Sequence, residues 1–307
     1  MESGPPAGEP LTWPAAPKEG LGSEQLQEIL IPGEDWKVAG DGYRSTDGPA
    51  ANSSGEVFFN DGRTGKTLKI ALDGKATDFL ADSHHGAGEA FGPDGRLYAV
   101  AAGSDQIIAY GTDGKPSVIT DNLHGNDIVV AADGGMYVTE SPQRADLIGK
   151  VWYISPKGEK KLVDPNFKFP NGLTLSPDQS QLYVGEYRSR WVYSYQIQSD
   201  GSLTLKQKFD DLYVPDSADD SAADGMRVDR DGRLYVTTRA GIQVCDQAGR
   251  LIAIIPTPNG RVSNLSFGGA NMDILYATCG DKIYARRLKT RGVLPFEAPI
   301  TPAAPKL

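Results

Sequence analysis

The sequence predicts an all-β protein, a six-bladed β-propeller whose blades are four-stranded antiparallel sheets around a central axis. Three observations support this prediction. Glycine accounts for 36 of 307 residues, about 12% against a usual share of about 7%. A short cassette of residues recurs six times. An Asp or Asn stands at the same offset before five of the six copies.

The glycine content indicates either disorder or many tight turns. Disorder is disfavoured, because 39% of the residues are hydrophobic and they recur in short, evenly spaced runs. Dipeptides such as Asp73-Gly74 and Asp113-Gly114 lie between such runs, and Asp-Gly is typical of a hairpin turn. The sequence therefore predicts many short strands joined by tight turns.

The cassette consists of a turn residue, one spacer, an aliphatic residue, and then Tyr or Phe at the start of a strand. Its aromatic members are Phe58, Tyr98, Tyr137, Tyr183, Tyr235 and Tyr276. Successive copies are 39 to 52 residues apart, and a four-stranded propeller blade takes about 40 to 50 residues. Six copies occupy the chain from about residue 40 to its end.

Three segments are expected. Residues 1–22 form a Pro-rich leader expected to be disordered, residues 23–294 the propeller, and residues 295–307 a Pro-rich tail. One short helix is expected within residues 23–31. A strand at 35–39 or 29–32 is expected to close the ring by joining the last blade.

The innermost strands of a propeller line its axis, so equivalent positions in the repeats converge there. Counting back seven residues from the turn before each cassette gives one residue per repeat: Asp47, Ala87, Asn126, Asn171, Asp224 and Asn264. These oxygen donors suit Ca²⁺, Mg²⁺ or Mn²⁺ better than a soft metal. Asp and Asn also favour turns, but a turn does not require the same offset in five repeats.

The segments around these positions resemble those of SMP-30/gluconolactonase/luciferin-regenerating-enzyme-like propellers, across the chain after residue 35. The motifs that carry the resemblance are Asp47-Gly48-Pro49, Gly125-Asn126-Asp127-Ile128-Val129, Pro170-Asn171-Gly172-Leu173, Ala223-Asp224-Gly225-Met226-Arg227-Val228-Asp229 and Asn264-Leu265-Ser266-Phe267. The resemblance implies one bound divalent cation. Calcium is the expected ion, with Mg²⁺, Mn²⁺ and Zn²⁺ left open.

By resemblance, the metal ligands fall on four of the axial residues: Asp47, Asn126, Asn171 and Asp224. Asn264 is then a candidate to support these ligands rather than to bind the ion. The first acid of the family is usually Glu, and Asp47 is one methylene shorter. A metal at this ring could therefore lie off-centre, take a water into the gap, or bind more weakly.

The resemblance assigns catalysis to Asp224, as general base toward an attacking water or as nucleophile. His85 and His124 are further catalytic candidates, because both lie two residues before an axial position and so on the same strand face. Each could shuttle a proton or hydrogen-bond the substrate, or be an ordinary loop histidine. The family often has Arg, contacting substrate, at the position of His124.

These features predict a metal-dependent hydrolase that opens a sugar lactone or a related cyclic ester. Two alternatives remain open: a phosphotriesterase-like hydrolase on the same ring, and a non-catalytic calcium-binding propeller that serves recognition.

The net charge of −9 argues against nucleic-acid and anionic-membrane partners, and no apolar run approaches the roughly 18 residues of a membrane span. A small-molecule substrate and a monomer or weak homo-oligomer are expected. The Pro-rich ends favour a mature exported protein in the periplasm or outside the cell, with a cytoplasmic location left open. Cys245 and Cys279 allow one disulfide or none.

Overall fold

The computed structural model describes residues 24–144 and 147–305. It confirms the all-β prediction, since the described elements are strands except for one short helix, α1 (Glu24–Ile29). This helix lies within the segment where the sequence predicts one. The predicted leader, residues 1–22, lies outside the described residues. No helix in the described ranges has both the length and the apolar character needed to cross a membrane.

Within the described residues, the strands form five antiparallel sheets. Four of them have four strands each. In spatial order they are β5 (Gly86–Phe91), β6 (Leu97–Ala101), β7 (Gln106–Tyr110), β8 (Pro116–Thr120); β9 (Ile128–Val130), β10 (Met136–Glu140), β11 (Gly149–Ile154), β12 (Lys160–Phe167); β13 (Pro170–Leu175), β14 (Gln181–Glu186), β15 (Trp191–Ile197), β16 (Leu203–Asp211); and β17 (Met226–Val228), β18 (Leu234–Thr238), β19 (Gly241–Cys245), β20 (Leu251–Ile255).

The fifth sheet has six strands and joins the two ends of the chain. Its spatial order is β21 (Asn264–Gly268), β22 (Ile274–Arg287), β1 (Lys37–Ala51), β2 (Val57–Asp61), β3 (Lys66–Ile70), β4 (Ala76–Leu80). The prediction of six separate four-stranded sheets is therefore wrong. The reason is that β1 is 15 residues long and pairs with β22 near its start and with β2 near its end.

The pairing of β1 with β22 also closes the ring of sheets. Lys37 is paired with Ala285, and Val38 with Tyr284, so the predicted closing segment at residues 35–39 contributes its last residues to this strand. Leu30, in the other predicted closing segment, forms an isolated bridge with Leu288. The first strand of the propeller, β1, therefore completes the last repeat and closes the ring.

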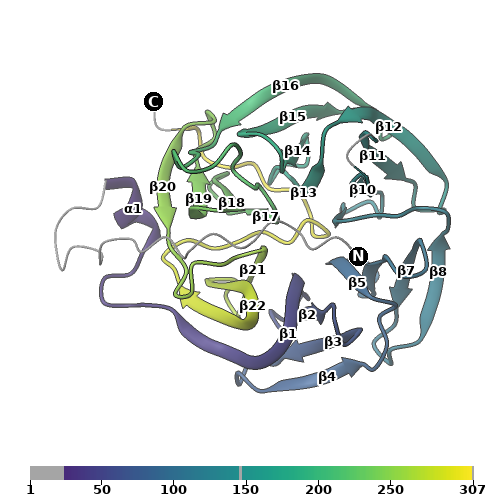
Figure 1. Cartoon of the computed structure of the whole chain (residues 1–307), viewed down its shortest axis with the longest axis horizontal. Coiled ribbons are helices and arrows are strands. Elements are labelled where there is room, and N and C mark those ends of the chain that lie inside the picture. The colour runs from purple at the N-terminus through teal and green to yellow at the C-terminus, as the bar shows by residue number, and fades with distance from the viewer. Residues whose placement is uncertain (1–23, 145–146, 306–307) are drawn as a thin grey trace.

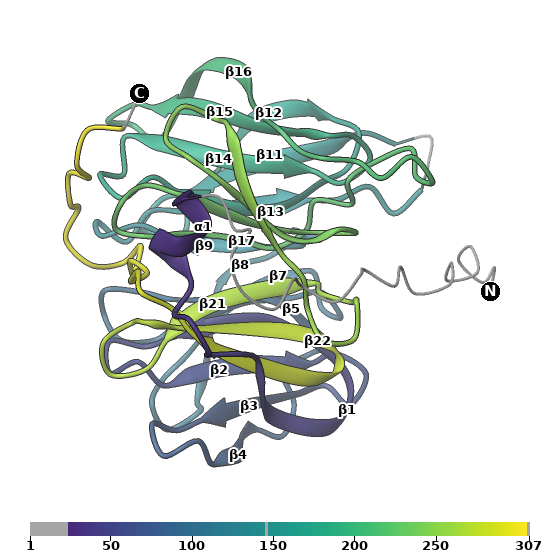
Figure 2. The ribbon, with the colours of Figure 1, turned by 90° about the vertical axis from the view of Figure 1, so that its left-hand side faces the viewer.

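The sheets surround a central axis (Figure 1). The first strand of each repeat, such as β5, β13, β17 and β21, lies toward the centre, and β4, β8, β16 and β20 lie at the outside (Figure 1). Burial follows the same order, since every residue of β13 is buried whereas most of β16 is exposed. Figure 2 shows the same sheets from the side.

The core lies between neighbouring repeats. In the described part of the chain, the buried hydrophobic side chains form six clusters, each combining residues of two adjacent repeats. The cassette aromatics, all less than 9% exposed, belong to these clusters, as when Tyr235 packs edge-on against Phe267 of the next repeat. The repeated aromatic thus joins each blade to its neighbours.

The turns before the second strands follow the predicted chemistry. Gly95 and Gly134 have φ angles of 77° and 83°, a left-handed conformation that only glycine adopts without strain. In the fourth and sixth cassettes, which lack this glycine, the left-handed residue is Gln179 or Met272 instead. Cys245 and Cys279 are both buried free thiols, so they do not form a disulfide.

Candidate functional site

Five of the predicted axial residues lie near or just before the start of an inner strand: Ala87 in β5, Asn126 before β9, Asn171 in β13, Asp224 before β17, and Asn264 in β21. Asp47 lies in the second half of the long strand β1, where β1 pairs with β2. Close backbone contacts join these residues. Gly48 packs against the carbonyl oxygen of Ala87 with no room for a Cβ atom. The backbone N–H of Gly88 in turn donates to the carbonyl oxygen of Asn126 (2.8 Å).

The same kind of contact continues around the other half of the axis. Two of these contacts are hydrogen bonds: Thr139 Oγ1 donates to the carbonyl oxygen of Asn171 (2.6 Å), and Ser263 Oγ donates to that of Thr46 (3.2 Å). The other two are close packing contacts of glycines. Gly172 packs against the carbonyl group of Asp224, and Gly225 packs against the side chain of Asn264. The six predicted positions therefore lie in one closed ring, which we call the axial ring. A glycine directly follows four of the six positions and allows this close approach.

Each acid of the axial ring is held by an asparagine, and Asp47 also by a backbone amide. Asn264 donates to Asp47, and Asn171 donates to Asp224. The backbone N–H of Gly48 also donates to Asp47 Oδ1 (2.8 Å). These bonds fix the direction of both carboxyl groups at the axis.

The electrostatics of the ring favour a cation. Burial raises the pKa of Asp47. Burial, followed by the charges of Asp47 and Asp127, raises the pKa of Asp224 well above its ordinary value. Carboxylates that converge in this way repel one another and gain protons unless a cation balances them.

The donor set fits a hard divalent cation held by carboxylate and amide oxygens. In the described part of the chain, no three His, Cys, Asp or Glu side chains gather as a metal site by themselves, so asparagines must complete the set. Asn171 uses its amide nitrogen toward Asp224, which leaves its oxygen for a cation. The oxygen of Asn264 instead accepts the backbone N–H of Leu265 (2.9 Å), so Asn264 suits a supporting role.

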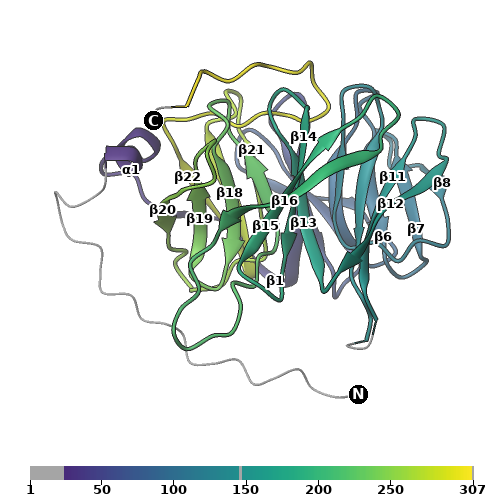
Figure 3. The same cartoon turned by 90° about the horizontal axis from the view of Figure 1, so that it is seen from above.

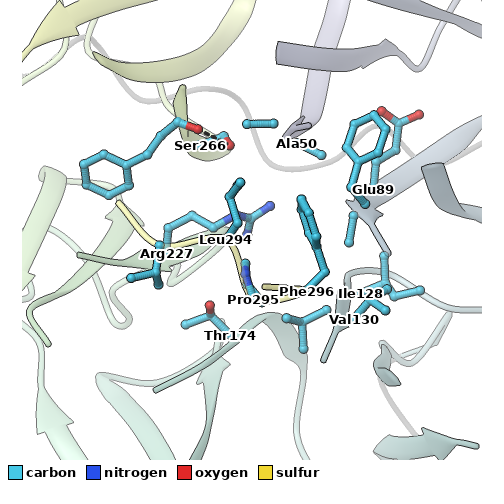
Figure 4. Close-up of a pocket in the computed structure, with 16 residues that line it drawn as sticks. Ala50, Glu89, Ile128, Val130, Thr174, Arg227, Ser266, Leu294, Pro295 and Phe296 are labelled. Atoms are coloured by element: carbon cyan, nitrogen blue, oxygen red, sulfur yellow. Dashed lines mark hydrogen bonds between the residues drawn. The ribbon is translucent and has the colours of Figure 1, made fainter. Parts of the chain in front are cut away.

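One end of the axial channel is filled by the C-terminal segment. This segment crosses the face of the propeller (Figures 1 and 3) and places Leu294, Pro295 and Phe296 among the ends of the inner strands (Figure 4). Phe296 packs against Phe91, with ring centroids 6.4 Å apart. The cavity left there is only about 30 Å³, the volume of about one water molecule. Residues 295–296, predicted to belong to a tail, thus contact the propeller.

At the other end, where the inner strands begin, Asp47, Asn126 and Asp224 are partly accessible. We call this the open end. Near it, a cavity of about 330 Å³ is lined by His124, Glu140 and Lys150, among other residues. The ion pair between Lys150 Nζ and Glu140 Oε1 (3.0 Å) forms part of its wall.

The two predicted histidines differ in their exposure and in their hydrogen-bond partners. His124 lines this cavity, and its Nδ1 lies 2.5 Å from Asp105 Oδ1. His85 is exposed, has a φ of 52°, and lies with Nδ1 3.2 Å from the carbonyl oxygen of Gly62. Among the described hydrogen bonds, none joins either histidine to the axial ring. The Asp105 carboxylate can orient His124 as a proton carrier.

Sequence reasoning assigned no role to three charged residues near the axis: Glu89, Asp127 and Arg227. Asp127 and Arg227 stand inside two of the quoted motifs, directly beside buried apolar residues of inner strands. A charged residue within such a strand is costly to bury without a partner. A charged residue next to the buried apolar residues of an inner strand was therefore the sequence feature that could have identified Asp127 and Arg227.

Comparison with known proteins places these features in a family. A family model described as "SMP-30/Gluconolactonase/LRE-like region" matches residues 46–281. A gluconolactonase of Zymomonas mobilis is 26% identical over 307 aligned positions, covering 88% of this chain and 86% of the relative.

Two solved structures are also similar. A gluconolactonase from Xanthomonas campestris has a TM-score of 0.76 at 25% identity, covering 87% of this chain and 93% of that one. A calcium-binding protein from Agrobacterium tumefaciens, a regucalcin, has a TM-score of 0.73 at 16% identity, covering 85% and 96%. The second similarity is evidence for the fold alone.

Proposed function

Because this chain belongs to the SMP-30/gluconolactonase/LRE-like family, we propose that it is a metal-dependent lactonase that opens a sugar lactone, such as gluconolactone, or a related cyclic ester. The observation that carries the proposal is the axial ring, where two partly accessible acids and three asparagines converge at the open end of the channel. The relative from Zymomonas mobilis, described as a gluconolactonase, supports this choice of substrate class.

The ligands of the cation would be Asp47, Asn126, Asn171 and Asp224, with Asn264 supporting Asp47. Calcium suits this set of oxygen donors best. When bound, the cation supplies Lewis-acid polarisation of the lactone carbonyl group. The two carboxylates offset its charge, and the cation would in turn favour the ionised form of Asp224, whose pKa is raised first by burial and then by the charges of Asp47 and Asp127.

Asp224 is the proposed catalytic base. Its carboxyl group is oriented by Asn171, so one oxygen can face an attacking water. It accepts a proton as the water oxygen bonds to the carbonyl carbon. The ring C–O bond then breaks, and the proton passes to the departing alkoxide oxygen. The product is an open-chain hydroxy acid.

His124 is the proposed substrate contact or proton shuttle at the open end. Its Nδ1 faces Asp105, which leaves Nε2 available toward the cavity that it lines with Glu140. His85, which packs near Gly62, remains a second candidate for the same work. Polar side chains at this cavity suit the hydroxyl groups of a sugar lactone.

We also propose that the molecule works as a six-bladed propeller, with the six-stranded sheet counted as its last and first blades. Six clusters between neighbouring repeats and the six positions of the axial ring support this count. With a small-molecule substrate at the axis, no nucleic-acid or membrane partner is needed. A monomer or weak homo-oligomer and an exported location remain predictions.

The proposed function is tested by measuring acid release from glucono-1,5-lactone in a pH-stat, with and without a chelator. An aryl ester and an aryl phosphotriester are run in parallel. Lactone turnover that the chelator abolishes and Ca²⁺ restores is expected. Turnover of the phosphotriester alone would favour the phosphotriesterase alternative, and no turnover of any substrate would favour a recognition propeller.

Asp224→Asn separates catalysis from metal binding. It should lower kcat at least 1,000-fold, because the base is lost, while Ca²⁺ still binds. The matched control is Asp231→Asn, an acid of the same repeat that lies in the turn before β18 and pairs with Arg233. Its activity should stay within about threefold of wild type. Near-normal turnover by Asp224→Asn would remove Asp224 from the mechanism.

A further inference from the structure

Arg227 is a half-buried cation on the inner strand β17, three residues after Asp224. Its side chain lines the axial channel beside Leu294 (Figure 4). Nη1 donates to the carbonyl oxygen of its neighbour Met226 (2.7 Å). Nη2 donates to the carbonyl oxygen of Pro49 (2.9 Å), two residues after Asp47 in the first repeat. The guanidinium is thus tied to two inner strands on different repeats.

The positive charge of Arg227 acts on carboxylates of the axis. Its strongest charge interactions are with Asp127 and then Asp47. Asp127 is only 2% exposed, and its Oδ2 has no hydrogen-bond partner in the structure. Such a buried carboxylate is costly without a nearby positive charge or further hydrogen bonds. The guanidinium supplies that charge.

The charges of the channel balance when one divalent cation is added. Asp47, Asp127 and Asp224 carry three negative charges when ionised, and Arg227 carries one positive charge. Glu89 does not enter this count, because burial raises its pKa to about 8 and it is mainly neutral at pH 7. Burial raises the pKa values of all three aspartates, and a nearby cation favours their ionised forms. With all three ionised, a single cation of charge two at the axial ring makes the channel neutral.

We propose that Arg227 is a fixed counter-ion of the axial carboxylates, and that it limits the channel to one divalent cation by supplying the charge that a second cation would bring. This inference rests on the proposed metal site. Arg227 is a positioning residue, since it acts on the metal and on Asp224 through the charge and orientation of their neighbours.

Arg227→Met tests the inference, because Met keeps much of the side-chain length and removes the charge. Binding of CaCl₂ is measured by isothermal titration calorimetry. Wild type is expected to bind one equivalent. The variant should bind a second equivalent, or bind the first at least tenfold more tightly, because the repelling charge is gone. Arg227→Lys should return binding toward wild type. One equivalent with an unchanged Kd in Arg227→Met would overturn the proposal.

Arg233→Met is the matched control. Arg233 is also mostly buried and belongs to the same repeat, but it pairs with Asp229 (3.1 Å) and Asp231 (2.7 Å) away from the axis. Its loss should lower the Tm and leave the stoichiometry and affinity for Ca²⁺ unchanged. An equal change in Ca²⁺ binding by this control would mean that loss of any buried arginine has the effect.

If wild type binds no Ca²⁺, the proposed function is wrong. A second measurement, which needs no metal, still tests the inference about Arg227 in that case. The Tm of the metal-free protein is compared for wild type, Arg227→Met, Asp127→Asn and the double variant. Asp127→Asn should recover most of the loss caused by Arg227→Met, because both charges are then absent. Strictly additive losses would overturn the pairing of Arg227 with Asp127. If Arg227→Met alone does not fold, folding of the double variant supports the pairing and its failure contradicts it.

Discussion

Glu89→Gln should change how the stability of the protein depends on pH. Glu89 lies on β5 and is fully buried, with Thr67 Oγ1 donating to its Oε1 (2.8 Å). Its Oε2 has no hydrogen-bond partner in the structure. Burial, with a smaller contribution from the charge of Asp47, raises the pKa of Glu89 to about 8. The folded protein therefore holds a proton here that the unfolded chain loses near its ordinary pKa of about 4.3.

The sign of the effect follows from which state binds the proton. Between the unfolded pKa and a folded pKa of about 8, the folded state binds more protons than the unfolded state, so stability falls as pH rises. Each pKa unit corresponds to about 1.4 kcal/mol. From pH 5 to pH 9, ionisation of Glu89 should thus lower the free energy of unfolding by about 4 kcal/mol. Glutamine keeps the shape and has no charge to bury.

The assay is urea unfolding of wild type and Glu89→Gln at pH 5, 7 and 9, with a chelator present. The two proteins should differ little at pH 5, and the variant should be more stable by about 4 kcal/mol at pH 9. Glu56→Gln, in the turn before β2 of the neighbouring repeat, is the control. Hydrogen bonds from Lys69 and Asn52 outweigh its partial burial and lower the pKa of Glu56, so this variant should gain no stability at high pH. A difference between Glu89→Gln and wild type that does not change with pH would refute the reasoning.

Three further changes test the ring, the filled end and the open end. Gly172→Ala should cost about 1–3 kcal/mol of unfolding free energy and weaken Ca²⁺ binding, because its Cβ would overlap the carbonyl oxygen of Asp224. The control is Gly62→Ala, whose Cβ would meet nothing closer than 3.8 Å, and it should cost less than about 0.5 kcal/mol. Equal losses of unfolding free energy in the two variants would contradict the crowding argument. Phe296→Ala should lower the urea midpoint by removing about 1–3 kcal/mol of packing, and an unchanged midpoint would mean that the C-terminal segment does not stabilise the channel. His124→Ala should raise KM for the lactone about tenfold with kcat within about threefold of wild type, whereas a 100-fold loss of kcat at unchanged KM would make His124 a catalytic residue.

Much of the fold could be predicted because it repeats. The cassette aromatic, such as Tyr98 or Tyr235, marks the same buried position in each repeat, and a β-sheet unit that recurs at this spacing has to stack around an axis. The number of sheets could not be predicted, because it depends on whether β1 continues from β22 to β2. That continuity is a matter of hydrogen bonding between the two ends of the chain, which no local pattern encodes.

The sequence by itself determined which residues meet at the axis. Equal offsets in equivalent repeats must converge, so Asp47 and Asp224 could be placed in one ring before any coordinates were known. Only the tertiary structure decided that Arg227 faces the channel, because the side of a strand that faces the axis depends on how each sheet is rotated against the next. It also decided that Phe296 fills one end of the channel, since that contact joins the C-terminal segment to Phe91, about 200 residues earlier in the chain. Repetition therefore determined the ring, and long-range packing determined its counter-ion and its closed end.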